Sequence, residues 1–331
     1  MNTNRILGER TGSVHGPLMI VFAQIHGNEP AGYLAVRELF NAIDEEYIQK
    51  HYFDFKGKIL ALQGNMKAAQ KGVRFLEKDL NRSWLPENVE RIFAAEDESE
   101  LDPEDLEIKG NLEIIYDYIE NYKPTRVVVL DLHTTTAHGG IFTIPATDPE
   151  SRRIALNLHA PVLHGFLDGL RGTTLHYFKK ENFPGIDMTA VCFEAGQHED
   201  SVSHMNAVSA IINCFRTIGG FYEEDIEIRH DLLLQRHANG LPREAKLVHV
   251  HRIKEGEEFR MRRDKTYQNF DRIEKDELLA LNINGEILSP YTGLILMPLY
   301  QQQGDDGFFI IQEVTNNAPM IVPSKGLAAS K

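Results

Sequence analysis

Short, unbroken apolar runs that alternate with amphipathic segments constrain the fold of this chain more than any other feature. The strongest run is residues 126–132 (RVVVLDL), and residues 18–25 (LMIVFAQI), 58–62 (KILAL) and 189–193 (TAVCF) have the same character. Unbroken apolar runs of this length are typical of strands buried on both faces of a parallel sheet. The sequence therefore predicts an α/β fold with a mixed, largely parallel sheet flanked by helices.

The segments between these runs have helical spacing. Residues 36–43 place apolar side chains at positions i, i+3, i+4 and i+7, after Pro30, which suits the first turn of a helix. Comparable apolar stripes occur within residues 111–122 and 208–215. The acidic segment 96–107 (EDESELDPEDLE) is predicted to be a solvated loop or a polar helix face.

The pattern changes at about residue 240. Beyond it, short strand-like runs are separated by Gly, Pro, Asn and Asp residues, which predicts a smaller, β-rich C-terminal domain. We expect the larger α/β domain at residues 1–235 and the β-rich domain at residues 236–331. The runs are residues 247–253, 257–261, 286–290, 293–298 and 308–314.

Composition excludes several classes of protein. Two cysteines, Cys192 and Cys214, cannot form a disulfide framework or a CxxC metal site, so histidines and carboxylates would have to hold any metal. The net charge of −14 disfavours binding to nucleic acid or to an anionic membrane surface. No apolar stretch has the length of a membrane span, and the first residues (MNTNRILGERTG) lack a signal-peptide core. We expect a cytoplasmic protein, with a homo-oligomer left open.

Three residues at strand ends have the chemistry of a metal site. His26 and Glu29 are three residues apart in a strand-to-helix turn, and His133 follows the strand at residues 126–132. The carboxyl ends of parallel strands meet at one edge of a sheet, where ligands bind. Two histidines and a glutamate form a known catalytic zinc set, which leaves one position for water. The sequence predicts a single zinc ion here, although another divalent ion stays open.

Other residues supply the remaining parts of a hydrolase. Glu194 follows the strand at residues 189–193 and is the expected general base. Asp131, two residues before His133, is a candidate hydrogen-bond partner for that histidine. The segment with Arg74 and Asn81-Arg82 supplies cations for an anionic substrate, since guanidinium groups bind carboxylates and stabilise oxyanions.

Each element of this pattern is weak alone. A His-x-x-Glu pair is usually a surface or core feature, and an acid after a strand often caps a helix. The joint occurrence of the elements carries the interpretation. His138, His198 and His204 are expected to be ordinary surface or core side chains, His249 and His251 to lie on a strand of the small domain, and Cys192 to be a buried structural thiol.

Together, these motifs resemble those of the succinylglutamate desuccinylase/aspartoacylase family, which is related to the zinc carboxypeptidases. The resemblance rests on HGNEPAG (26–32), RFLEKDLNRSW (74–84), DLHTT (131–135) and FEAG (193–196). It implies a zinc-carboxypeptidase-like fold with a C-terminal β-rich domain.

The resemblance also implies roles for individual residues. Arg74 would polarise the scissile carbonyl, and Asn81 and Arg82 would bind the substrate's α-carboxylate. Asp79 would be a supporting acid, and Tyr300 would reach the site from the small domain. The same resemblance implies His26, Glu29 and His133 as zinc ligands and Glu194 as the base.

One feature departs from the pattern of the aspartoacylases. They have an arginine shortly before the catalytic glutamate, whereas this chain has Lys179 and Lys180. The acyl group and the amino acid therefore stay open.

The predicted function is a zinc-dependent deacylase. It would cleave the amide bond of a small, carboxylate-bearing N-acyl amino acid, such as an N-succinyl- or N-acetyl-amino acid, with metal-activated water and Glu194 as base. Two alternatives are a zinc carboxypeptidase acting on a peptide or cell-wall fragment, and a non-catalytic metal-binding protein with the same fold.

Overall fold

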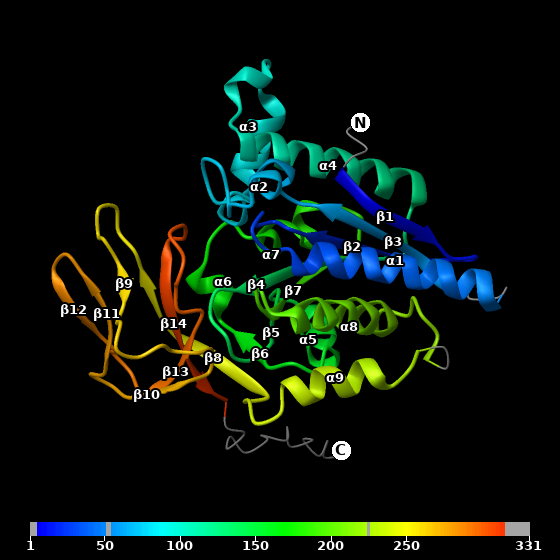
Figure 1. The fold of residues 1–331 in the computed structure, drawn as a ribbon. Coiled ribbons are helices and arrows are strands. Elements are labelled where there is room, and N and C mark those ends of the chain that lie inside the picture. Colours follow the sequence, from blue (N-terminus) through cyan, green and yellow to red (C-terminus); the bar gives the residue numbers. More distant parts are fainter. Residues whose placement is uncertain (1–4, 51–53, 224–225, 315–331) are drawn as a thin grey trace, which may run out of the picture.

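A computed structural model describes residues 5–50, 54–223 and 226–314 of the chain. Within these ranges, one eleven-stranded sheet extends from the N-terminal part into the C-terminal part (Figure 1). Its strands, from edge to edge, are β1 (Ile6–Thr11), β3 (Lys56–Gln63), β2 (Val14–Ala23), β4 (Val127–Thr135), β7 (Met188–Gln197), β5 (Phe142–Pro145), β6 (Val162–His164), β8 (Glu244–Arg252), β14 (Asp306–Glu313), β13 (Gly293–Leu296) and β10 (Arg272–Ile273). A three-stranded sheet consists of β12 (Gly285–Leu288), β11 (Leu278–Asn282) and β9 (Arg260–Met261).

The centre of the large sheet is parallel. Strands β3, β2, β4 and β7 run in one direction, while β1 and β5 are antiparallel to their neighbours β3 and β7. The strands from β8 to β10 pair in antiparallel fashion. The predicted α/β fold with a largely parallel sheet and a β-rich C-terminal part is therefore confirmed. Strands β1, β5, β6, β10 and β11 were not predicted from the sequence, because short or half-polar strands lack a long apolar run.

Helices cover both faces of the sheet. Along β2, Leu18, Ile20 and Phe22 pack into one core, and the alternate residues from Met19 to Ala23 pack into another, as the two-residue period of a strand requires. The second core is completed by α1 (Ala31–Lys50), α5 (Pro149–Asn157), α8 (Ser201–Thr217) and α9 (Arg229–His237). The first is completed by α3 (Pro86–Ala94), α4 (Pro103–Tyr122), α6 (Phe166–Gly169) and α7 (Thr174–Tyr177), and the short α2 (Met66–Lys71) lies near α4 (Figure 1).

The prediction of a solvated acidic segment at residues 96–107 is wrong for its second half. Helix α4 begins at Pro103, and Glu104, Asp105 and Glu107 are buried. Glu104 accepts hydrogen bonds from the backbone N–H groups of Leu76 and Glu77. Buried carboxylates of this kind are stabilised by donors from distant segments, which a local charge pattern does not reveal.

The C-terminal part has its own small core and is joined to the rest of the sheet by β8, which pairs with β6. Helix α9 ends at His237, so the predicted boundary after residue 235 lies in its last turn. The division into residues 1–235 and 236–331 stays a prediction, and residues 315–331 lie outside the described ranges. No helix in the described part of the chain combines the length and apolar character needed to cross a membrane.

Candidate active site

The predicted metal ligands lie together at the carboxyl ends of the central strands. His26 and Glu29 occupy the turn between β2 and α1, and His133 lies near the end of β4. Glu29 bridges the two rings: its Oε1 is 2.7 Å from Nδ1 of His26, and its Oε2 is 3.1 Å from Nδ1 of His133. One ligand atom from each residue can be chosen so that all lie within 4.8 Å of one another. All three side chains are buried.

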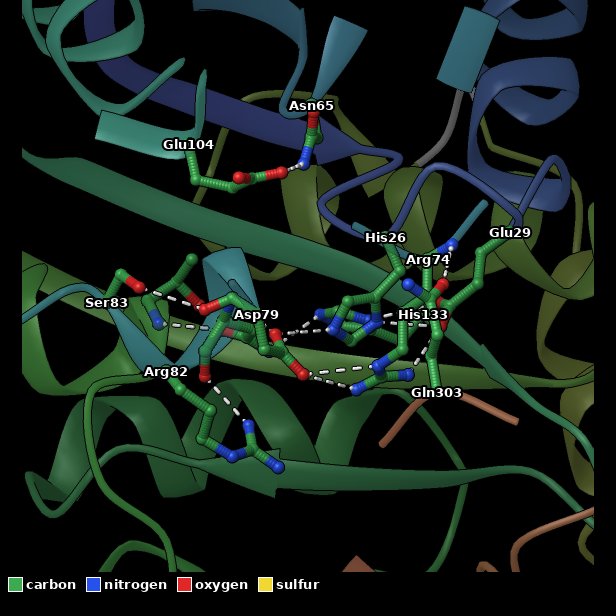
Figure 2. Close-up of polar contacts among 12 residues, drawn as sticks. His26, Glu29, Asn65, Arg74, Asp79, Arg82, Ser83, Glu104, His133 and Gln303 are labelled. Atoms are coloured by element: carbon green, nitrogen blue, oxygen red, sulfur yellow. Dashed lines mark hydrogen bonds and ion pairs between the residues drawn. The ribbon is translucent and has the colours of Figure 1, made fainter. Parts of the chain in front are cut away.

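The other ring nitrogens contact aspartates. Nε2 of His26 lies 3.2 Å from Oδ1 of Asp79, and Nε2 of His133 lies 3.0 Å from Oδ2 of Asp131. Figure 2 shows the carboxylate of Asp79 in contact with both the imidazole of His26 and the guanidinium of Arg74. In metal sites, carboxylates in this position fix the tautomer and orientation of ligating histidines. Both Nδ1 atoms are thereby directed towards Glu29, and the donor set fits a divalent ion such as Zn²⁺.

The charges of the cluster also favour a cation. Burial opposes ionisation of Glu29, but the two imidazoles outweigh it and hold its pKa well below the usual range. Burial likewise opposes ionisation of Asp79, but Arg74 and His26 hold its pKa well below normal. Burial lowers the pKa of His133, yet Asp131 and Glu29 raise it well above its ordinary value. A buried excess of carboxylates is the environment that a divalent ion neutralises.

Glu194 lies on β7, directly opposite His133 of β4 in the parallel pairing. Both strands continue two or three residues beyond these side chains, so the two residues lie near the strand ends and not after them. Among the described residues, Oε2 of Glu194 has no hydrogen-bond partner. Burial, together with nearby Glu29 and Asp131, raises the pKa of Glu194 to about 8. A buried carboxyl group with a pKa near neutrality suits a general base.

Arg74 is fixed beside the metal ligands. Its Nε and Nη2 donate to Oδ2 of Asp79 at 3.1 and 3.0 Å, and its Nη1 lies 3.7 Å from Oε1 of Glu29. Its backbone N–H donates to Oε1 of Gln303 at 3.1 Å, a contact with the C-terminal part that Figure 2 includes. The guanidinium is therefore held in place at the metal cluster, where it could bind a substrate oxygen.

Asn81 and Arg82 lie in a short 3₁₀ turn, Leu80–Arg82, which Asp79 caps by accepting from the backbone N–H of Asn81 at 2.8 Å. The side-chain oxygen of Asn81 accepts from the backbone N–H of Thr174 at 3.0 Å. Nη2 of Arg82 lies 2.6 Å from Oδ2 of Asp306 on β14.

A glycine permits the close approach of two segments here. A Cβ at Gly172, where φ is +72°, would lie 2.2 Å from the carbonyl oxygen of Arg82. Only glycine therefore allows the chain before α7 to pack against the turn that carries Asn81 and Arg82.

One cavity, of about 110 Å³, connects these groups. The metal ligands, Glu194, Arg74, Asn81 and Arg82 all contribute to its lining, so the structure brings together seven of the eight predicted site residues. The full set is His26, Glu29, Arg74, Asn81, Arg82, His133 and Glu194.

Tyr300 does not line this cavity. Its hydroxyl donates to the backbone carbonyl of Tyr267 at 3.2 Å and accepts from the backbone N–H of the same residue at 2.8 Å, and the side chain is 40% exposed. The structure therefore does not bring Tyr300 to the cavity, although this was expected from the sequence. Two nearby residues of the C-terminal part, Gln301 and Asp306, line the cavity instead.

The cavity is also lined by residues to which the sequence gave no role at the site. His198, expected to be ordinary, lines the cavity and contacts the hydroxyl of Thr134 through Nδ1 at 2.7 Å. Burial lowers its pKa. Cys192 is buried, as expected, but it also lines the cavity. A histidine after a strand end was the available signal for His198; nothing in the local sequence indicated Asp306.

Several solved structures have the same fold as this chain. A structure named succinylglutamate desuccinylase/aspartoacylase from Rhodobacter sphaeroides superposes with a TM-score of 0.58 at 14% identity, covering 94% of this chain and 88% of that one. The product-bound ectoine utilization protein EutE (DoeB) from Ruegeria pomeroyi gives 0.59 at 15% identity over 92% and 87%. A succinylglutamate desuccinylase from Chromobacterium violaceum gives 0.57 at 14% over 94% and 89%. At such identities the likeness concerns the fold alone.

A sequence relative is more similar over a shorter stretch. A probable aspartoacylase from Nostoc sp. is 38% identical over 119 residues, which is 36% of this chain and 35% of that protein. The match thus spans about a third of the relative's length.

The family model described as the succinylglutamate desuccinylase/aspartoacylase catalytic domain matches residues 15–204. This range is more than half of the 331-residue chain and contains every site residue from His26 to Glu194. The chain therefore belongs to the succinylglutamate desuccinylase/aspartoacylase family.

Proposed function

We propose that this protein is a zinc-dependent deacylase that hydrolyses the amide bond of an N-acyl amino acid. The observation that carries the proposal is the position of Glu194: a buried carboxyl group with a free oxygen lies in the same cavity as a three-residue metal cluster and two arginines. Family membership supports the same class of reaction.

His26, Glu29 and His133 would hold the ion, and Asp79 and Asp131 would orient the two imidazoles. A bound Zn²⁺ supplies Lewis-acid chemistry, because it acidifies water and polarises a carbonyl group. The residues of the chain then perform the proton transfers and bind the substrate.

Glu194 accepts a proton from the attacking water and later donates it to the nitrogen of the leaving amine. Arg74 donates hydrogen bonds to the oxygen of the scissile carbonyl as negative charge develops there. This role suits a guanidinium that Asp79 holds in place, since a preorganised donor needs little rearrangement during the reaction.

Asn81 and Arg82 bind the α-carboxylate of the substrate. Part of the Arg82 guanidinium is engaged by Asp306, but its buried Nε has no hydrogen-bond partner among the described residues. A guanidinium has five N–H donors, so Arg82 can bind Asp306 and a substrate carboxylate together.

The size of the cavity favours a small substrate over a peptide. The segment from Met297 to Asp306 contributes to its lining, and Asn28, in the turn that carries His26 and Glu29, donates from Nδ2 to Oε1 of Gln301 at 2.9 Å. This segment of the C-terminal part covers one side of the cavity and limits the room for an extended peptide.

A cytoplasmic location, the absence of nucleic-acid or membrane partners, and a homo-oligomer stay predictions.

The test is release of free amine from a panel of N-acyl amino acids and one short peptide, by metal-loaded and chelator-treated protein. We expect chelator-sensitive release from N-acyl amino acids, restored by Zn²⁺. Glu194→Gln should retain the metal and lose turnover, whereas Glu120→Gln, at an exposed position on α4, should be fully active. Release from the peptide alone would assign the protein to the carboxypeptidases. Zinc binding without turnover of any panel member would favour a non-catalytic metal-binding protein.

A further inference from the structure

The cavity has walls of two kinds. Its polar part contains the metal ligands, Glu194 and the two arginines. A second part, here called the apolar wall, consists of six side chains: Ile144, Leu167, Leu170, Leu175, Cys192 and Phe309. None of these six side chains has a role in the proposed reaction.

The apolar wall adjoins the residues proposed to bind the α-carboxylate. Leu167, Leu170 and Leu175 lie on the chain around α6 and α7, and Thr174 in the same segment donates its backbone N–H to Asn81. Phe309 follows Asp306, the partner of Arg82, by three residues on β14.

The wall also reaches the general base. Cys192 precedes Glu194 by two residues on β7, so the two side chains share a face of the strand. Ile144 on β5 is the register partner of Cys192. A substrate held between Asn81-Arg82 and Glu194 would therefore direct the side chain of its amino acid at the apolar wall.

Few positive charges are available near this wall. Among the described residues that line the cavity, Arg74 and Arg82 are the only arginine or lysine side chains. Each already contacts a carboxylate, Arg74 that of Asp79 and Arg82 that of Asp306. Lys179 and Lys180 are exposed and do not line the cavity. A second substrate carboxylate would be buried against apolar groups without a cation, which is unfavourable.

We infer that this site takes an N-acyl amino acid with an apolar, uncharged side chain, so that the α-carboxylate is the only charge on the substrate. The inference rests on the proposed deacylase function and concerns its specificity. An apolar side chain would gain from burial against the wall, whereas aspartate and glutamate side chains would lose solvation without a partner.

The decisive measurement compares kcat/KM for substrates that share one acyl group and differ in the side chain. N-acetyl-leucine and N-acetyl-aspartate have similar shapes and differ in charge, and N-acetyl-asparagine separates charge from polarity. N-acetyl-methionine and N-acetyl-glutamate form a second pair. We expect the apolar member of each pair to be preferred at least ~100-fold.

A substitution in the apolar wall tests whether the lack of a positive charge there excludes acidic side chains. Leu170 is partly exposed, so an arginine there can be accommodated and can reach a substrate carboxylate. Leu170→Arg should lower kcat/KM for N-acetyl-leucine and raise it for N-acetyl-aspartate. The matched control is Leu232→Arg, at a position on α9 that is 49% exposed and outside the cavity, which should keep the wild-type preference.

Binding to zinc-loaded Glu194→Gln, measured by calorimetry, gives a readout that does not depend on turnover. Tighter binding of N-acetyl-leucine than of N-acetyl-aspartate would support the inference. A preference for the acidic member in both turnover and binding would overturn it and leave the deacylase function intact. If neither substrate class is bound or hydrolysed, the proposed function itself fails, and the inference fails with it.

Discussion

Asp306 on β14 binds Arg82 across the junction of the catalytic and C-terminal parts, with Oδ2 of Asp306 lying 2.6 Å from Nη2 of Arg82. Its other oxygen, Oδ1, lies 2.5 Å from Nη1 of Arg252 on the neighbouring strand β8. One carboxylate thus joins an arginine of the proposed substrate site to an arginine of the C-terminal part. Asp306 is buried, while Arg82 is partly exposed.

Asp306→Asn should destabilise the protein, because it leaves two arginines side by side with no shared carboxylate. Breaking a buried ion pair costs roughly 3–5 kcal/mol, and the exposure of both arginines reduces this to about 2 kcal/mol in the free energy of unfolding. Chemical denaturation measures the change. Asp305→Asn is the control, since the neighbouring side chain is exposed. Equal stability of the two variants would mean that the Asp306 ion pairs contribute little.

Arg74→Ala should lower kcat by about 10²–10³-fold and change KM less, because the guanidinium is proposed to act on the developing oxyanion. Steady-state kinetics on the best substrate, with the metal content of each preparation determined, measures both constants. Arg229→Ala, at a position 71% exposed, should match the wild type. A rise in KM with unchanged kcat would instead assign Arg74 to ground-state binding.

Much of the metal site could be predicted because it depends on local patterns. The unbroken apolar runs before His26, His133 and Glu194 indicate parallel strands, and parallel strands bring their carboxyl ends to one edge. Hydropathy alone thus places three site residues near one another. The His-x-x-Glu spacing then adds Glu29 within one turn.

The contacts that the sequence did not predict connect distant segments. Arg82 and Asp306 are 224 residues apart, and nothing in the sequence near either residue indicates the other. Glu104 appeared to belong to a solvated acidic run, yet it anchors the backbone at Leu76. Tyr300 lies in the expected segment, but the direction of a side chain after a short strand depends on loop paths that hydropathy does not encode.

Asp131→Asn should weaken metal binding. The aspartate contacts Nε2 of His133 and accepts a hydrogen bond from the hydroxyl of Thr174 at 2.5 Å, so it is itself held in position. Loss of such a partner typically lowers metal affinity by 10–100-fold. Competition with a chromophoric chelator measures the zinc affinity. Asp168→Asn, at an exposed position on α6, is the control. Unchanged affinity in Asp131→Asn would show that His133 is oriented without this contact.

Glu194 gives the metal-free protein a distinct pH dependence. Burial raises the pKa of this carboxyl group to about 8, whereas an unfolded chain has the ordinary value of 4.5. The folded state therefore binds more protons than the unfolded state between these two values, and stability falls as the pH rises from about 4.5 to 8.

Glu194→Gln should abolish this fall in stability at high pH, because the amide group of glutamine does not ionise. In chelator-treated protein, the variant should be more stable than the wild type at pH 9 and show no such advantage at pH 4.5. Thermal unfolding across this range, with Glu120→Gln as a control at an exposed site, measures the difference. A constant difference between Glu194→Gln and the wild type at every pH would contradict the raised pKa. It would also remove one argument for Glu194 as the base, because a carboxyl group with an ordinary pKa would be a weaker acceptor of the water's proton.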